Sequence, residues 1–176
     1  MTVKETVLSC LEQHRGETVS GQQLADAAQV SRSAVWKAIH QLEQEGHQIA
    51  VLPHKGYRLE TDSDRLSPQA IRQALDSPYR DIPLFLFDTI DSTNQEAKRR
   101  LLEQAQHRTV ILSEAQTQGR GRLGRSFYSP ASTGLYFSAI LKLNLPLEQV
   151  GCLTVAAANA VCRGLEELGV EHPGIK

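Results

Sequence analysis

Cysteine is scarce in this chain, and its placement excludes the common cysteine-based scaffolds. The three cysteines, Cys10, Cys152 and Cys162, are far apart or share one helical pattern, and no two of them form a C-x-x-C pair. Disulfide frameworks and zinc sites need paired or closely spaced cysteines. We therefore expect neither a disulfide framework nor a zinc site, and we assign no metal ligand.

Long apolar runs and a strong net charge are also absent. No stretch approaches the roughly 20 apolar residues of a membrane-spanning helix, and the chain begins in an amphipathic pattern without a signal-peptide core. We therefore expect a cytoplasmic protein with no membrane partner. The formal net charge of −1 over 176 residues argues against a broad nucleic-acid-binding surface, although a local basic patch would not show in this sum.

The first sixty residues carry the pattern of a winged helix-turn-helix. Capping boxes at Thr2–Glu5 and Ser20–Gln23 open two helices, and Ser31 caps a third helix with an apolar stripe. A strand, a Pro-Gly turn and a returning strand follow over residues 48–60 and predict the wing. We place this domain at residues 1–62.

The third helix of this unit is the candidate DNA-reading element. Basic side chains cluster on its outward face and on the wing, and no carboxylate interrupts that face before Glu43, which favours DNA binding. Acidic residues elsewhere in the unit keep a purely protein-binding winged helix as the alternative. Trp36 follows the core position Val35, so we expect it to be a partly buried brace. The residues expected to face DNA are Ser31, Arg32, Ser33, Lys37, His40 and, on the wing, His54 and Lys55.

A polar segment, Thr61–Arg65, marks a domain boundary, after which strands and helices alternate. Ser67-Pro68 predicts the start of a short helix, and an apolar strand begins at Leu84 and continues through Ile90. The later elements expected are a helix at 95–105, strands at 109–113 and 134–141, a helix at 147–168, and the opening of a strand at 172–176. The strand at 134–141 is expected to pair with the strand at 109–113.

A polar turn, Asp91-Ser92-Thr93-Asn94, lies where a strand gives way to a helix. Its residues could be simple helix caps, because Ser92-x-x-Gln95 is a capping box. Three small polar side chains exceed the need of one cap, however, and helix N-termini offer hydrogen-bond donors to ligands. The turn is therefore a candidate site for a neutral polar ligand.

The segment Gly119–Arg125 interleaves three glycines with three arginines and matches G-x-G-x-x-G. A dinucleotide-binding fingerprint requires a helix directly after this motif, whereas residues 126–134 have the composition of a turn and a strand. The arginines favour contact with a ligand phosphate. A solvated surface turn and an RGG-like nucleic-acid segment are the alternatives.

Taken in order, four segments resemble the bifunctional biotin protein ligases, whose members with an N-terminal winged helix also repress biotin-synthesis genes. They are residues 91–94, 114–118, 119–125 and 174–176. The resemblance covers essentially the whole chain. It implies an α+β fold, in which the winged helix-turn-helix precedes part of a mixed sheet domain like that of class II aminoacyl-tRNA synthetases, at residues 66–176. It also implies that the catalytic domain is incomplete and that a C-terminal β-barrel is absent, so we expect reduced activity of this piece alone.

The resemblance further implies a two-step reaction. The carboxylate of biotin attacks the α-phosphate of Mg-ATP to give biotinyl-5′-adenylate, and a lysine of a carboxylase carrier domain then takes the biotinyl group. The cofactors implied are biotin, ATP and Mg²⁺, and the partners are the carrier domain, operator DNA and a second copy in a ligand-dependent dimer. An arginine-rich loop would neutralise charge at the α-phosphate and shield the adenylate from water.

Site residues follow from the same resemblance. The implied biotin-binding residues are Ser92, Thr93, Asn94 and Gln116. The implied adenylate-binding residues are Gly119, Arg120, Gly121, Arg122 and Arg125, and the catalytic ones are Arg122 and Lys176. Leu123 and Phe127 depart from residues that are common in the family. The alternatives are a winged-helix regulator with a non-catalytic sensor domain and, less favoured because such enzymes lack a winged helix, a lipoyl ligase.

Overall fold

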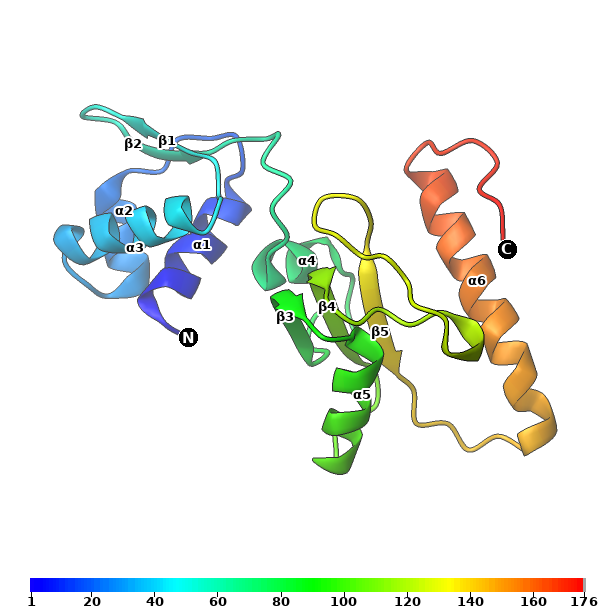
Figure 1. The fold of residues 1–176 in the computed structure, drawn as a ribbon. Coiled ribbons are helices and arrows are strands. Elements are labelled where there is room, and N and C mark those ends of the chain that lie inside the picture. Colours follow the sequence, from blue (N-terminus) through cyan, green and yellow to red (C-terminus); the bar gives the residue numbers. More distant parts are fainter. Residues whose placement is uncertain (176) are drawn as a thin grey trace. The chain divides into compact units, whose positions relative to one another are not determined.

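The computed structural model describes residues 1–175, with Arg122 and Leu147 described by their backbone alone. The described chain forms two compact units that divide after Ile140. Figure 1 shows the elements in sequence colours. In chain order they are α1 (Val3–Gln13), α2 (Gly21–Ala28), α3 (Arg32–Gln44), β1 (Ile49–Leu52), β2 (Gly56–Leu59), α4 (Pro68–Ala74), β3 (Leu84–Ile90), α5 (Thr93–Leu102), β4 (Thr109–Gln116), η1 (Arg122–Gly124), β5 (Tyr136–Ile140), η2 (Leu147–Gln149) and α6 (Val150–Glu167).

The N-terminal helices begin at the predicted capping residues. The side chains of Thr2 and Ser20 each accept a hydrogen bond from the backbone three residues on, and Glu5 and Gln23 complete the two capping boxes. Helices α1 to α3 share one apolar core with the wing, in which each fully buried leucine contributes roughly 1.5–3 kcal/mol. The buried core residues are Val7, Leu8, Leu11, Val19, Leu24, Ala25, Val35, Ala38, Ile39, Leu42 and Leu59. The predicted winged helix-turn-helix is confirmed.

The wing is anchored to the segment that precedes α2. Strands β1 and β2 are antiparallel, with Ile49 opposite Leu59. The N–H of Val19 donates to the Tyr57 carbonyl at 2.8 Å, and the N–H of Tyr57 donates to the Val19 carbonyl at 2.9 Å. Gly56 lies against this bridge with φ of +136°, and a Cβ there would be 2.1 Å from the Val19 carbonyl oxygen. Only glycine fits this position.

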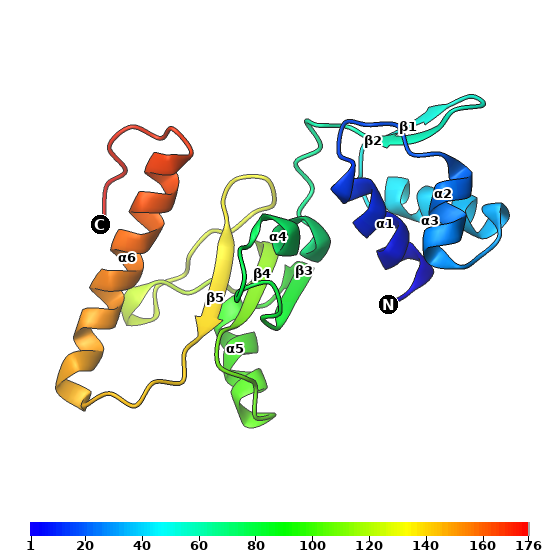
Figure 2. The same cartoon turned by 180° about the vertical axis from the view of Figure 1, so that it is seen from behind.

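The second sheet has the strand order β3-β4-β5. Strands β3 and β4 are parallel, and β5 pairs antiparallel with β4, as the sequence predicts. Helix α5 connects the two parallel strands and packs on β4 and β5, where Ala97, Ile111 and Ile140 form a small core. Figure 2 shows the three strands side by side and α5 following β3. The segments that follow β3 and β4 therefore emerge at the same end of the sheet, where the two parallel strands have their carboxyl ends.

Three elements differ from the sequence-based expectation. Helix α5 begins at Thr93, so Thr93 and Asn94 belong to its first turn. Strand β4 continues to Gln116, because its pairing with β3 extends to the Ile90 position. Residues 172–175 form a bend and irregular backbone, so no strand opens there within the described residues. A strand needs a hydrogen-bonding neighbour, and none pairs with these four residues.

The second unit contains α6, which ends at Glu167, just before the predicted stop at Gly169. Gly169 has φ of +84°, and the N–H of Val170 donates to the Leu165 carbonyl at 3.0 Å across it. This left-handed residue after the last helical turn is the usual glycine C-cap. Over residues 1–175, no helix combines the length and apolarity needed to cross a membrane. The same residues contain no metal-binding cluster of three or more His, Cys, Asp or Glu.

Candidate functional site

The polar turn, residues 91–94, and the glycine- and arginine-rich segment, residues 119–125, lie at the same end of the β3-β4-β5 sheet, beyond the carboxyl ends of β3 and β4. The chain leaves β3 at Ile90 and enters the turn Asp91–Asn94, which leads into α5. It leaves β4 at Gln116, opposite Ile90, and enters the Gly/Arg loop, Gly119–Arg125. Crevices at the carboxyl ends of parallel strands are common ligand sites in α/β sheets.

Gln116 joins these two motifs through both ends of its side-chain amide. Its Oε1 accepts hydrogen bonds from the Thr93 N–H at 2.8 Å and from the Thr93 hydroxyl at 3.2 Å. Its Nε2 donates to the Ser129 hydroxyl at 3.1 Å, and its backbone N–H donates to the Ser129 carbonyl at 2.9 Å. The polar turn is thereby tied to the segment that follows the Gly/Arg loop.

Ser138 on β5 extends this network to the third strand. Its hydroxyl lies 2.9 Å from the Thr93 hydroxyl and 2.8 Å from Asn94 Oδ1, and it can donate to either. Neither Ser129 nor Ser138 was predicted from the sequence to belong to this network. A single serine beside a proline or within a strand has no motif, and only the pairing of β5 with β4 brings Ser138 to the site.

The predicted capping box at Ser92 and Gln95 is wrong. Ser92 is the N-cap residue of α5, but its side chain makes no cap hydrogen bond. The Ser92 N–H instead donates to Asp91 Oδ1 at 2.7 Å, and Gln116 accepts the next amide, that of Thr93. Gln116 of β4 therefore accepts a hydrogen bond from the first turn of α5, and the buried Ser92 hydroxyl makes no cap hydrogen bond.

Charged side chains on α5 fix the acidic residue at the start of the turn. Arg99 donates to both oxygens of Asp91, at 2.7 and 2.9 Å, and also to Glu96 at 2.8 Å. The hydrogen bonds from Arg99, with a smaller contribution from the Ser92 N–H, lower the pKa of Asp91 to about 2. Hydrogen bonds to Asp91 and Glu96 raise the pKa of Arg99, and the hydrogen bond from Arg99, together with that from Arg100, lowers the pKa of Glu96. Asp91 is therefore a permanently ionised anchor at neutral pH.

The Gly/Arg loop has a fixed base. The N–H of Gly121 donates to the Arg125 carbonyl, and the N–H of Phe127 donates to the Gly119 carbonyl, both at 2.8 Å. A Cβ on Gly119 would lie 2.5 Å from the Phe127 carbonyl oxygen and 2.6 Å from the Ser129 hydroxyl. The base closes this tightly only because residue 119 has no side chain.

The tip of the loop projects into solvent. Leu123 has φ of +57° and is 94% exposed, and the side chains of Arg120 and Arg125 are exposed as well. The backbone of Arg122 lies in the short helix η1, but its side chain is outside the described structure, as is all of Lys176. The loop thus has a base held by backbone hydrogen bonds and exposed cationic side chains, those of Arg120 and Arg125.

A hollow of about 390 Å³ lies beside the base of the loop. It is walled by the segments on either side of the loop, residues 115–119 and 126–130, and the described residues lining it carry no charged side chain. Phe127 and Tyr128 contribute exposed rings to it. An uncharged hollow beside exposed arginines can accept a ligand that has an apolar end and an anionic end.

The predicted DNA-facing residues are exposed, and four of them, Arg32, Ser33, His54 and Lys55, line one groove. Ser31, Arg32, Ser33, Lys37, His40, His54 and Lys55 are all exposed. The prediction for Trp36 is wrong: its side chain is 54% exposed, with its ring edge-on to His40 at a centroid distance of 4.1 Å. One residue on from Val35 is about 100° around a helix, which turns Trp36 away from the core.

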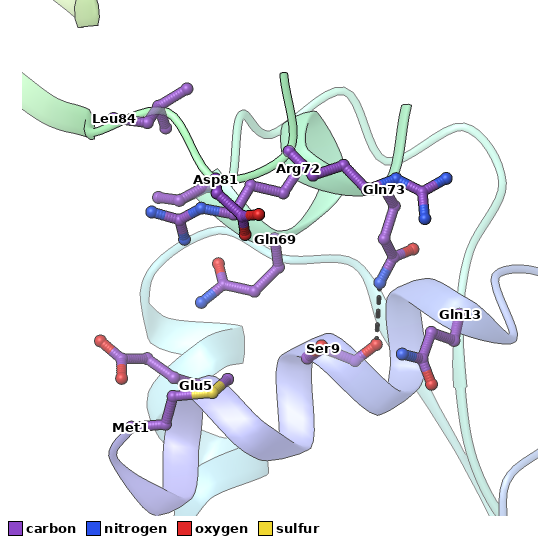
Figure 3. Close-up of a pocket in the computed structure, with 11 residues that line it drawn as sticks. Met1, Glu5, Ser9, Gln13, Gln69, Arg72, Gln73, Asp81 and Leu84 are labelled. Atoms are coloured by element: carbon purple, nitrogen blue, oxygen red, sulfur yellow. Dashed lines mark hydrogen bonds between the residues drawn. The ribbon is translucent and has the colours of Figure 1, made fainter. Parts of the chain in front are cut away.

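A separate hollow of about 710 Å³ lies between α1 and α4. Figure 3 shows Glu5, Ser9 and Gln13 of α1 facing Gln69, Arg72 and Gln73 of α4, with Gln73 donating to the Ser9 carbonyl at 3.1 Å. Its lining mixes both signs of charge, with Glu5 and Asp81 against Arg72 and Arg80. No residue of the polar turn or the Gly/Arg loop lines it, so we do not assign the site there.

Two family models match the chain. An HTH domain matches residues 3–58, and the biotin/lipoate A/B protein ligase family matches residues 86–176. Among curated proteins, the chain is 35% identical over 175 residues to the bifunctional ligase/repressor BirA of Bacillus subtilis (strain 168). It is 32% identical over 162 residues to the protein of the same name from Escherichia coli (strain K12).

These alignments cover nearly all of this chain and only part of each relative. The B. subtilis match covers 99% of this chain and 54% of the relative, and the E. coli match covers 92% and 49%. The chain thus spans about half the length of the curated relatives it matches. A solved biotin protein ligase from Leishmania major, in complex with biotinyl-5-AMP, matches 39% of this chain and 28% of its own at 25% identity and a TM-score of 0.33.

Proposed function

The chain belongs to the biotin/lipoate A/B protein ligase family, and from this premise we propose that the protein activates biotin with ATP and transfers it to a lysine of a carboxylase carrier domain. We assign this reaction to the ligase domain, to which residues 66–176 belong. Residues 1–62 carry a second activity, biotin-responsive repression through operator DNA.

The proposal rests on a structural joint, namely the side-chain hydrogen bonds by which Gln116 links the polar turn to the segment after the Gly/Arg loop. It holds the polar turn through Thr93 and the far side of the Gly/Arg loop through Ser129, at 2.8 and 3.1 Å. A ligand bound across this joint would meet short neutral polar groups at one end and arginines at the other. Biotinyl-adenylate has that distribution, with a neutral ureido ring and an anionic phosphate.

The residues divide between the two ends of this ligand. Ser92, Thr93, Asn94 and Gln116 bind the biotin ring by hydrogen bonds, and the buried Ser92 hydroxyl is available for that purpose because it caps no helix. The loop residues Gly119, Arg120, Gly121, Arg122 and Arg125 hold the adenylate. Arg122 and Lys176 are the groups assigned to the reacting phosphate and carboxylate.

The proposed reaction requires no covalent bond between the protein and its substrates. The attack of a carboxylate on the α-phosphate concentrates negative charge there, and arginine donors held in place lower its energy. Closing the loop tip over the product would keep water from the mixed anhydride. Mg²⁺ would enter with the nucleotide, held by its phosphate oxygens.

The winged helix links this reaction to transcription. We infer that bound adenylate orders the Gly/Arg loop, that ordering favours a dimer, and that the dimer places two winged helices on a two-fold operator. Such coupling requires that ligand bind the dimer more tightly than the monomer. ATP, carrier domain and operator are all available in the cytoplasm, where we propose that the protein works.

Carrier modification tests the enzymatic part. The protein is incubated with ATP, biotin and a purified carrier domain, and the carrier is analysed by mass spectrometry and peptide mapping. We expect one biotinyl group on a single lysine, with none when ATP or biotin is omitted. A carrier that stays unmodified while the protein binds biotin would indicate the alternative, a ligand sensor without catalysis.

A further inference from the structure

Trp36 is exposed and is not part of the apolar core of the first three helices. It is the single tryptophan of the chain, and 54% of its surface is accessible. The core-facing side of α3 is already filled by Val35, Ala38 and Ile39, and the indole ring lies edge-on to His40. Leaving about half of so large an apolar side chain in water forgoes about half of the free energy of its burial.

The indole lines a groove between α3 and the wing. This groove has a volume of about 700 Å³, and Val51 of β1, itself an exposed apolar side chain, lines it together with Trp36. Arg32 of α3 and Lys55 of the wing tip supply cationic groups, and the His54 ring adds a hydrogen-bonding side chain. Among the described residues that line the groove, none carries a carboxylate. The hollow between α1 and α4, by contrast, contains Glu5 and Asp81.

Few kinds of partner fit an apolar ring whose charged neighbours in the groove are cations and not carboxylates. Exposed apolar surface rimmed by polar groups marks a binding site. A partner for this groove must present regularly spaced negative charge and, between the charges, small apolar surfaces. Duplex DNA does so, because phosphates alternate with deoxyribose along the strand and thymine methyl groups edge the major groove.

We propose that Trp36 is a DNA-contacting residue. Its indole packs on a deoxyribose or a thymine methyl group of a duplex seated between α3 and the wing, while Arg32 and Lys55 bind the flanking phosphates. The inference rests on the proposed DNA-binding function and adds to it an apolar contact that the basic residues alone would not provide.

Because Trp36 is the single tryptophan, its fluorescence reports on the contact directly. The probe is a fluorescein-labelled duplex that the protein selects from a random-sequence pool, and its anisotropy measures binding independently. We expect the Trp36 emission to change, and its quenching by acrylamide to fall about twofold or more, over the same titration range as the anisotropy. A rise in anisotropy with unchanged emission and quenching overturns the role of Trp36 and leaves DNA binding intact. No anisotropy change with any selected duplex overturns the DNA-binding function itself.

Variants separate contact from folding. Trp36→Ala should weaken binding to the selected duplex by about tenfold, within the range for loss of one aromatic contact, while Trp36→Phe retains most of the affinity. Leu102→Ala is the matched control, since Leu102 is an exposed apolar side chain on α5. Equal affinities of Trp36→Ala and wild type, with both folded by circular dichroism, would contradict the proposal.

The two possible partners of the indole are distinguished with modified DNA. Replacing thymine by uracil in the selected duplex removes only the methyl groups. If the methyl is the partner, uracil DNA should weaken wild-type binding and leave Trp36→Ala unaffected; if deoxyribose is the partner, both proteins should bind the two duplexes alike. A change in sedimentation of Trp36→Ala without DNA, at unaltered DNA affinity, would instead assign the groove to a second copy of the chain and overturn the proposal.

Discussion

Thr93 and Gln116, 23 positions apart in the sequence, are joined by two hydrogen bonds to a single oxygen. The backbone N–H and the hydroxyl of Thr93 both donate to Gln116 Oε1, at 2.8 and 3.2 Å. This contact caps α5 from the neighbouring strand and leaves Ser92 out of the cap. The polar turn and the strand that leads into the Gly/Arg loop are therefore joined directly by hydrogen bonds.

Gln116→Ala should weaken biotin binding by roughly tenfold or more. The change removes the acceptor of two Thr93 donors, and an unsatisfied partly buried donor costs about 1–3 kcal/mol. Isothermal titration calorimetry with biotin measures the effect. Gln106→Ala, an exposed glutamine that does not line the hollow beside the loop, is the matched control and should bind as wild type does. Equal affinities of the two variants would contradict the role given to Gln116.

Gly119→Ala and Gly121→Ala should differ sharply in stability. A Cβ on Gly119 would lie 2.5 Å from the Phe127 carbonyl oxygen, whereas a Cβ on Gly121 would make ordinary contact, at 3.6 Å from Arg125 O. We expect Gly119→Ala to lower the free energy of unfolding by about 1–3 kcal/mol, in the range of overpacked sites. Urea denaturation compares the two, and a larger loss for Gly121→Ala would show that the loop base is described wrongly.

Arg122→Ala should slow biotin-dependent pyrophosphate release by about a hundredfold, the usual consequence of removing one donor to developing charge. It should also let labelled biotinyl-adenylate dissociate during rapid gel filtration. Leu123→Ala is the control, because Leu123 occupies the same exposed tip without a charge. Retention of the adenylate by Arg122→Ala would remove Arg122 from the site.

The Asp91 carboxyl should titrate with a pKa of about 2, measured by NMR from its carbon shift. Hydrogen bonds from Arg99 hold it below the ordinary value of about 3.9. Because the folded-state pKa is lowered, the stabilisation from this pair is present above about pH 4 and is lost as the pH falls towards 2. Arg99→Gln should return the pKa towards its ordinary value; an unchanged pKa in that variant would show that Arg99 is not the cause.

Arg32→Ala and Lys37→Ala should each weaken DNA binding and leave carrier biotinylation unchanged. If each side chain binds one phosphate, the slope of log affinity against log salt should fall by about 0.9 per substitution. Fluorescence anisotropy at several salt concentrations measures this slope. Lys98→Ala, an exposed lysine on α5, controls for net charge. Loss of both activities in one variant would indicate misfolding.

Local signals in the sequence were sufficient for most elements of the fold. Capping boxes at Thr2 and Ser20 and the glycine after α6 are short-range features whose physics does not depend on the rest of the chain, and each is found where predicted. The capping box at Ser92 failed because a tertiary contact from Gln116 outcompeted it. Such a contact leaves no trace within four residues of the helix start.

The sequence points to the two motifs of the candidate site but not to the side chains that hold them together. The polar turn and the Gly/Arg loop could be recognised from residue types and order, whereas Ser129 and Ser138 enter only through strand pairing. Trp36 shows the opposite error. Burial of an aromatic residue is a sound expectation on average, but the stripe on α3 was already complete without it.

The central claim is that the polar turn and the Gly/Arg loop together hold one activated biotin. Its most direct test is pyrophosphate release from ATP by the protein in the absence of any carrier, with biotin compared against lipoate at equal concentration. The account predicts a burst of pyrophosphate that requires biotin and stops near one equivalent per site, because the adenylate stays bound. No biotin-dependent release, or an equal release with lipoate, would contradict it.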